Sequence, residues 1–97
     1  MKIRIVITVS GKVQGVSFRK QTARMAEELG VCGWVMNLSD GSVQGCFEGG
    51  SAAVEALFTW CSVGPERASV NFLTCDIQPY TGEFRDFRVV LEEVKAA

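Results

Sequence analysis

The spacing of apolar residues changes between residues 10 and 19, and this change constrains the fold most. Before the stretch, apolar and polar residues mostly alternate, with apolar residues at Ile3, Ile5, Ile7 and Val9. This alternation predicts a β-strand over about 2–9. After the stretch, apolar residues recur at helical spacing, which predicts an amphipathic helix over about 19–29. Residues 10–19 are therefore expected to form a loop that leads from a strand into a helix.

This loop has features that suit a small anion. Gly11 and Gly15 let the backbone turn and approach a ligand closely. The first N–H groups of the following helix have no partner within the helix, and Arg19 stands at the junction. Amides, a helix N-terminus and a guanidinium together favour phosphate. Many such loops bind nothing, however, and an arginine at a helix start is usually solvated.

The rest of the chain predicts the element order β-α-β-β-α-β with a short final strand. This order favours a ferredoxin-like α+β sandwich, in which two helices cover one face of an antiparallel sheet, as a single domain over residues 1–97. The expected later elements are a strand over 31–38, a strand over 42–48, a helix from Ser51 or Ala52 to Cys61 with Ser51 as N-cap, a strand over 68–77 with a bulge between Val70 and Leu73, a strand over 84–91, and a frayed tail over 92–97.

The second and third predicted strands form a hairpin whose register follows from its turn. A three-residue turn with Gly41 in the left-handed conformation sets Asn37 opposite Val43, whereas a two-residue turn would change the partners. The core face then carries Val31, Gly33, Val35, Asn37, Val43, Gly45 and Phe47. The other face, expected to be partly wet, carries Cys32, Trp34, Met36, Leu38, Gln44, Cys46 and Glu48.

Asn37 is the second candidate site residue. In a ferredoxin-like sheet the first and third strands are central neighbours, so the loop after the first strand and the hairpin turn are expected at one end. An asparagine before a turn more often makes a local hydrogen bond. On the core side, however, it needs partners, and a water held above a bound phosphate would provide them.

Composition excludes several classes of protein. A net charge of −1 and a pI near 5.4 argue against a protein that mainly grips nucleic acid. No apolar run approaches the roughly 20 residues that span a membrane, and the N-terminus alternates like a strand rather than a signal peptide, so a cytoplasmic location is expected. The chain has no histidine, which removes the usual general base and metal ligand.

The four cysteines do not form a recognisable metal or redox motif. None lies in a CxxC pair, and each falls within a predicted strand or helix. Buried or half-buried free thiols are expected, with a disulfide as the alternative. The cysteines are Cys32, Cys46, Cys61 and Cys75.

Two motifs resemble those of the acylphosphatase family. Residues 11–19, GKVQGVSFR, are similar to the signature G-x-V-Q-G-V-x-F-R. Residues 33–37, GWVMN, with DGSV at 40–43, are similar to the second motif G-x-V-x-N followed by D-G-x-V. Asp86 and Phe87 also resemble the family's last strand, so the resemblance extends from about Ile3 to Val90.

The resemblance implies hydrolysis of acyl phosphates to a carboxylate and inorganic phosphate, with no metal and no cofactor. It makes Arg19 the phosphate-binding arginine and Asn37 the residue that positions the attacking water. No catalytic role falls to the side chains of Ser17 and Lys20. The expected partner is a small-molecule acyl phosphate, with no nucleic acid and no membrane, and the chain is expected to be a monomer. The phosphate would be cradled by the backbone amides of Gln14, Gly15, Val16, Ser17 and Phe18.

Two other functions remain open. A non-catalytic module of this fold could stack RNA bases on Trp34, and a channelling domain could pass an acyl or carbamoyl phosphate to a partner. Basic residues could add positive potential around the mouth of the site, or they could be scattered solvated charges. They are Lys2, Arg4, Lys12, Lys20 and Arg24.

Overall fold

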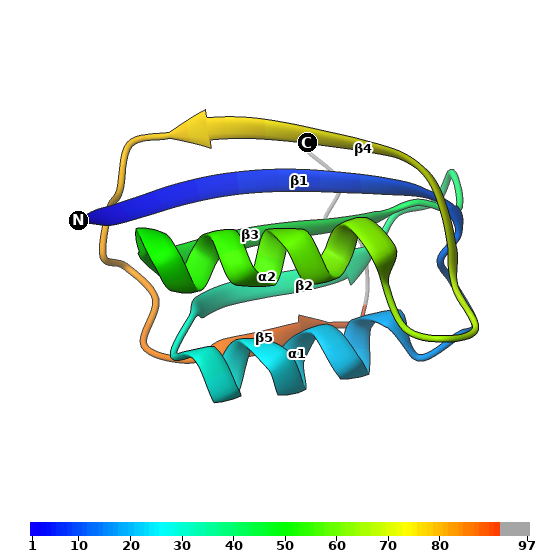
Figure 1. The fold of residues 1–97 in the computed structure, drawn as a ribbon, viewed down its shortest axis with the longest axis horizontal. Coiled ribbons are helices and arrows are strands. Elements are labelled where there is room, and N and C mark those ends of the chain that lie inside the picture. The colour runs from blue at the N-terminus through cyan, green and yellow to red at the C-terminus, as the bar shows by residue number, and fades with distance from the viewer. Residues whose placement is uncertain (92–97) are drawn as a thin grey trace.

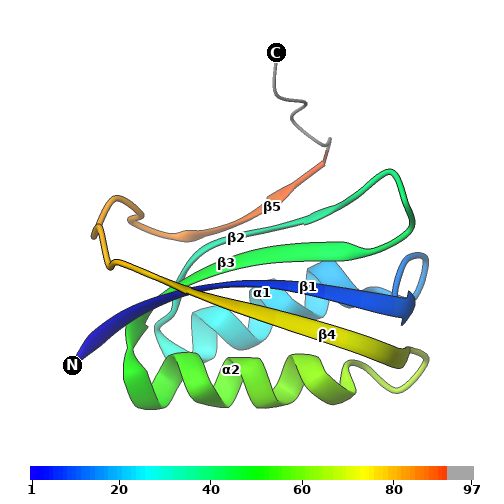
Figure 2. The ribbon, with the colours of Figure 1, turned by 90° about the horizontal axis from the view of Figure 1, so that it is seen from above.

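The computed structural model describes residues 1–91, which form a five-stranded sheet with two helices on one face (Figure 1). Viewed from above, both helices lie on the same side of the strands (Figure 2). The predicted order of elements is confirmed. The elements are β1 (Lys2–Lys12), α1 (Phe18–Leu29), β2 (Cys32–Asn37), β3 (Val43–Gly50), α2 (Ser51–Val63), β4 (Ser69–Gln78) and β5 (Phe87–Val90).

The strands lie in the order β4-β1-β3-β2-β5, with β1 and β3 adjacent at the centre as expected for a ferredoxin-like fold. The sheet is mixed rather than wholly antiparallel, because β5 runs parallel to β2, from Gly33 opposite Phe87 to Met36 opposite Val90. The last strand is also shorter than the expected 84–91. The tail predicted over 92–97 lies outside the described residues.

The hairpin has the predicted register. Asn37 pairs with Val43, and the turn closes through the N–H of Leu38, which donates to the carbonyl of Ser42 at 2.8 Å. Val35 and Phe47 are buried on the core face, as expected. The predicted bulge is also confirmed, since the pairing of β1 with β4 skips Asn71.

The two helices complete the core, which is made of apolar side chains from both helices, from β1, β2, β3 and β5, and from the loops beside α1. Helix α1 ends at Leu29, and the next residue, Gly30, has a left-handed φ of 74°, as is common just after a helix. The expected N-cap of α2 is wrong: Ser51 is the first helical residue, Gly50 precedes it, and no side chain caps this end. The buried helix residues are Phe18, Thr22, Ala26, Val54, Leu57 and Cys61, while Phe58 is half-buried.

The prediction of a partly wet second face is wrong for Cys46 and Glu48, which are 0% and 2% exposed. The segment after β4 folds back over this part of the sheet. The Glu48 carboxylate accepts hydrogen bonds from the N–H and hydroxyl of Thr81, both at 2.9 Å, and from the N–H of Gly82 at 3.1 Å. Arg4 adds an ion pair at 3.3 Å. Strand alternation carries no information about a loop that returns from a distant part of the chain.

These contacts predict that Glu48→Gln destabilises the fold. Burial opposes ionisation of Glu48, but the hydrogen bonds from Thr81, Arg4 and Gly82 outweigh it and lower its pKa below the ordinary 4.5. The amide of the introduced glutamine would leave some of the hydrogen-bond donors around residue 48 unpaired. The free energy of unfolding should therefore fall by about 1–3 kcal/mol at neutral pH. Because the folded-state pKa is depressed, the wild-type advantage should shrink as the pH falls below 4.5. Urea unfolding measures both effects, and the exposed Glu55→Gln is the control.

The cysteines are free, and their burial varies. Cys46 and Cys61 are buried and Cys32 is half-buried, as expected, but Cys75 is exposed because β4 is an edge strand. Burial raises the pKa of the Cys61 thiol to about 12, so this group stays protonated at neutral pH. Within residues 1–91, no helix is long and apolar enough to cross a membrane.

Candidate active site

The loop that joins β1 to α1 is held by buried side chains on both sides of Gln14. Because β1 continues to Lys12, this loop is shorter than the expected 10–19. Val13, Val16 and Phe18 are 1%, 5% and 2% exposed and pack into the core. We call residues 13–18 the anion loop. The buried anchors fix its backbone against the sheet, while Gln14 is half-buried and residues 15 and 17 are exposed.

The anion loop turns through two left-handed residues. Gly15 has a φ of 74° and Ser17 a φ of 63°. Ser17 is the one non-glycine residue with a positive φ within residues 1–91, a conformation that costs on the order of 1 kcal/mol. Such strain at a helix N-terminus is typical of a loop whose shape serves a ligand.

The backbone amides of this loop also suit an anionic ligand. Four successive N–H groups of the loop donate no hydrogen bond to any acceptor within the described part of the chain. They belong to Gln14, Gly15, Val16 and Ser17. The Ser17 side chain makes no capping hydrogen bond to α1. The loop therefore presents a row of unpaired donors at the positive end of a helix, which is an arrangement that binds anions.

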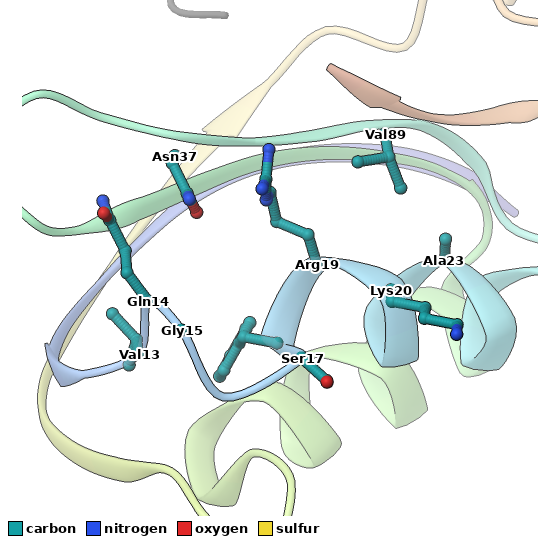
Figure 3. A pocket seen from close by; sticks show the side chains of 10 residues that line it. Val13, Gln14, Gly15, Ser17, Arg19, Lys20, Ala23, Asn37 and Val89 are labelled. Atoms are coloured by element: carbon teal, nitrogen blue, oxygen red, sulfur yellow. The ribbon is translucent and has the colours of Figure 1, made fainter. Parts of the chain in front are cut away.

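Arg19 extends from the first turn of α1 toward β2 (Figure 3). Its side chain is half-buried, and Nη1 donates to the backbone carbonyl of Val90 in β5 at 3.1 Å. One contact of the guanidinium is thus made to the last strand. A guanidinium carries five N–H donors, so most of them remain for another acceptor. The contact with Val90 could not be predicted, because a backbone carbonyl carries no residue-specific signal.

Asn37 is the last residue of β2 and faces the same space. Its Oδ1 atom is buried and has no hydrogen-bond partner among residues 1–91. A buried acceptor without a partner costs about 1–3 kcal/mol, so a water or ligand at this atom would stabilise the site. The structure thus places a free acceptor where the sequence predicted a residue in need of partners.

A cavity of about 380 Å³ brings these groups together between the anion loop, α1, β2 and β5. Most of the predicted site residues contribute to its wall. Val16, which is buried in the core, does not. The wall residues are Val13, Gln14, Gly15, Ser17, Phe18, Arg19, Lys20, Ala23, Asn37 and Val89.

The side chain of Gln14 makes a contact that sequence reasoning missed. Its Nε2 donates to the carbonyl of Leu38 at 2.8 Å and to the carbonyl of Ser42 at 2.9 Å. These carbonyls flank the turn of the hairpin that carries Asn37. The predicted proximity of loop and turn is therefore confirmed, and a direct hydrogen-bonded link joins them.

Of the five basic residues that could add positive potential around the mouth of the site, only Lys20 lines the cavity, so the others fit scattered surface charge better. Lys20 lines the cavity, but its ammonium end points away from Arg19 and Asn37 (Figure 3). Lys2 and Arg4 lie at the opposite end of β1 from the anion loop, where Arg4 forms ion pairs with Glu48 and Glu83. Arg24 lines a neighbouring hollow that shares Lys20 with the site.

Unpaired loop amides, a guanidinium and a buried amide oxygen around one cavity define a small-anion site on a ferredoxin-like sandwich. This combination can hold a tetrahedral oxyanion and offers an acceptor to a water beside it. The acylphosphatase family model matches residues 5–89, and the chain belongs to the acylphosphatase family. Hydrolysis of acyl phosphates is the function of this family.

Individual relatives agree with this assignment. An acylphosphatase of Geobacter sulfurreducens is 54% identical over 89 residues, which cover 92% of this chain and 98% of that protein. The solved acylphosphatase of Coxiella burnetii is 39% identical with a TM-score of 0.87, and covers 92% of this chain and 93% of its own. The Bacillus subtilis acylphosphatase is 27% identical with a TM-score of 0.87, and covers 91% and 98%.

Proposed function

We propose that this chain hydrolyses the carboxyl–phosphate bond of small acyl phosphates, without a metal or cofactor. The observation that carries the proposal is the convergence of Arg19, the amides of the anion loop and the unpartnered oxygen of Asn37 on one cavity. The products are a carboxylate and inorganic phosphate.

The phosphoryl group binds to the anion loop and to Arg19. The amides of residues 14–18 direct their N–H groups at its oxygens, and the guanidinium makes two parallel hydrogen bonds to it. The contact with Val90 supports this role, because it holds the guanidinium beside the loop before substrate arrives. Phosphoryl transfer through a loose transition state depends mainly on such positioning and charge stabilisation.

Asn37 positions the attacking water. Its buried Oδ1 accepts a hydrogen bond from the water and thereby orients it toward phosphorus. An amide does not take up a proton near neutral pH, so Asn37 is not a general base. The proton of the water leaves late, to a phosphate oxygen of the substrate. The leaving carboxylate has a conjugate acid with a pKa of roughly 4, so it needs no general acid.

The oligomeric state, the cellular location and the class of substrate are part of the same proposal. The chain is further proposed to act as a monomer and to form one domain over residues 1–97. The four free thiols are compatible with a reducing cytoplasm. The net charge of −1 and the half-buried position of Trp34 favour a small-molecule substrate over nucleic acid.

Hydrolysis of benzoyl phosphate tests the proposed function. The purified chain should hydrolyse it at the same rate in excess EDTA as with added magnesium. The turnover rate should be nearly constant from about pH 5 to 8, because the chain has no histidine to titrate there. A folded but inactive chain, or activity that EDTA removes, would contradict the proposal. A group titrating near neutrality would contradict the late transfer of the proton.

A further inference from the structure

We propose that Gln14 is a positioning residue, whose side-chain amide fixes Asn37 by tying the hairpin turn to the anion loop. This inference rests on the proposed function, because it assigns Gln14 a part in placing the attacking water. It concerns the side chain of Gln14, whereas the phosphate is bound by the backbone amide.

The link is made by both donors that a glutamine side chain has. Nε2 of Gln14 lies 2.8 Å from the carbonyl oxygen of Leu38 and 2.9 Å from that of Ser42. Both distances lie within the usual range of N–H···O hydrogen bonds. Each of these carbonyls also accepts a backbone bond inside the turn, from Gly41 at 3.2 Å and from Leu38 at 2.8 Å. The amide therefore holds the two sides of the turn at once.

The anion loop is the fixed side of this link. Three nearly fully buried side chains, Val13, Val16 and Phe18, hold the loop against the core on either side of Gln14. Removing the Gln14 amide leaves these anchors in place. The backbone amides that face the phosphate should therefore keep their positions.

The hairpin turn is the other side of this link. Residues 39–41 are exposed and lie beyond Asn37 and Val43, the last pair of the β2–β3 ladder. Asp40 shapes the turn from within by accepting a bond from the N–H of Ser42 at 2.9 Å. Bonds from the hydroxyl and N–H of Ser42 lower the pKa of the Asp40 carboxyl. These contacts keep the turn's own shape, but they do not tie it to the loop.

Asn37 depends on its backbone for its position, since its Oδ1 has no partner among the described residues. Leu38, the next residue, is held by Gln14. Without that bond, the end of β2 can shift relative to the loop and the bound phosphate. A misplacement of about 1 Å can lower a rate by about 10²-fold. Loss of the link should thus impair turnover much more than phosphate binding.

Gln14→Met tests this inference, because methionine has a similar length and offers no donor. We expect kcat for benzoyl phosphate to fall by about 10-fold or more, while KM and the inhibition constant of inorganic phosphate change less than about 3-fold. Gln14→Glu, whose carboxylate repels both carbonyls, should show the same split and provides a second variant if the first folds poorly. The control is Gln44→Met, a half-buried glutamine of β3 on the opposite sheet face, which should retain wild-type kcat.

A double-mutant cycle separates positioning from a general structural role. If Gln14 acts through Asn37, Gln14→Met should lower kcat less than about 3-fold in a chain that already carries Asn37→Ala. An equal loss in both backgrounds, or a matching rise in the phosphate inhibition constant, would overturn the inference. If the wild type is active and the Gln14 variants have the same kcat as the wild type, this inference is wrong but the proposed function stands. An inactive wild type would instead refute the proposed function.

Discussion

Replacing Arg19 by alanine is expected to lower kcat/KM for benzoyl phosphate by about 10²-fold or more. The guanidinium lines the cavity beside the anion loop and is the charged group that Val90 holds in place there. Its loss removes a charge-assisted, two-pronged contact with the phosphoryl group, so both binding and turnover should suffer. Steady-state kinetics measures the effect. Arg67→Ala, at an exposed arginine that does not line the cavity, is the control and should leave the kinetics unchanged.

The conservative variant separates charge from geometry. Arg19→Lys keeps the positive charge but lacks the planar fork, so it should recover only part of the lost activity. Full recovery would mean that Arg19 supplies charge alone, and wild-type activity in Arg19→Ala would remove it from the site.

Replacing Asn37 by alanine is the second large expected effect. Because Asn37 is proposed to act on the water, kcat should fall by about 10²-fold while the inhibition constant of inorganic phosphate stays within about 3-fold of wild type. Product inhibition measured beside turnover tests this split. Asn71→Ala, an exposed asparagine at the bulge of β4, is the matched control. A weakened phosphate affinity equal to the loss in kcat would place Asn37 among the phosphate-binding groups instead.

The approach of Asn37 to Arg19 could be predicted from sequence, because the register of the hairpin and the order of the strands both place Asn37 near the first loop. Gly41 fixed the hairpin register, so Asn37 was expected on the core face opposite Val43, and the structure confirms this pair. The ferredoxin-like strand order placed the hairpin turn and the first loop at one end. The fold and the pair of candidate residues thus followed from local patterns and one topological rule.

The contacts that hold these residues could not be predicted in this way. Arg19 contacts the carbonyl of Val90, and Gln14 contacts the carbonyls of Leu38 and Ser42. Backbone carbonyls are present at every residue, so no sequence pattern marks the ones that accept a distant side chain. The same holds for the burial of Glu48, which depends on amides of a loop more than thirty positions away.

Titration of inorganic phosphate into the wild-type, Arg19→Ala and Asn37→Ala proteins tests the central claim most directly. The claim is that Arg19 and the anion loop hold the phosphoryl group while Asn37 acts on the water. Calorimetry should show phosphate binding to the wild type and to Asn37→Ala with similar affinity, and binding to Arg19→Ala too weak to measure. Equal binding by the wild type and Arg19→Ala, or loss of binding in Asn37→Ala, would contradict the claim.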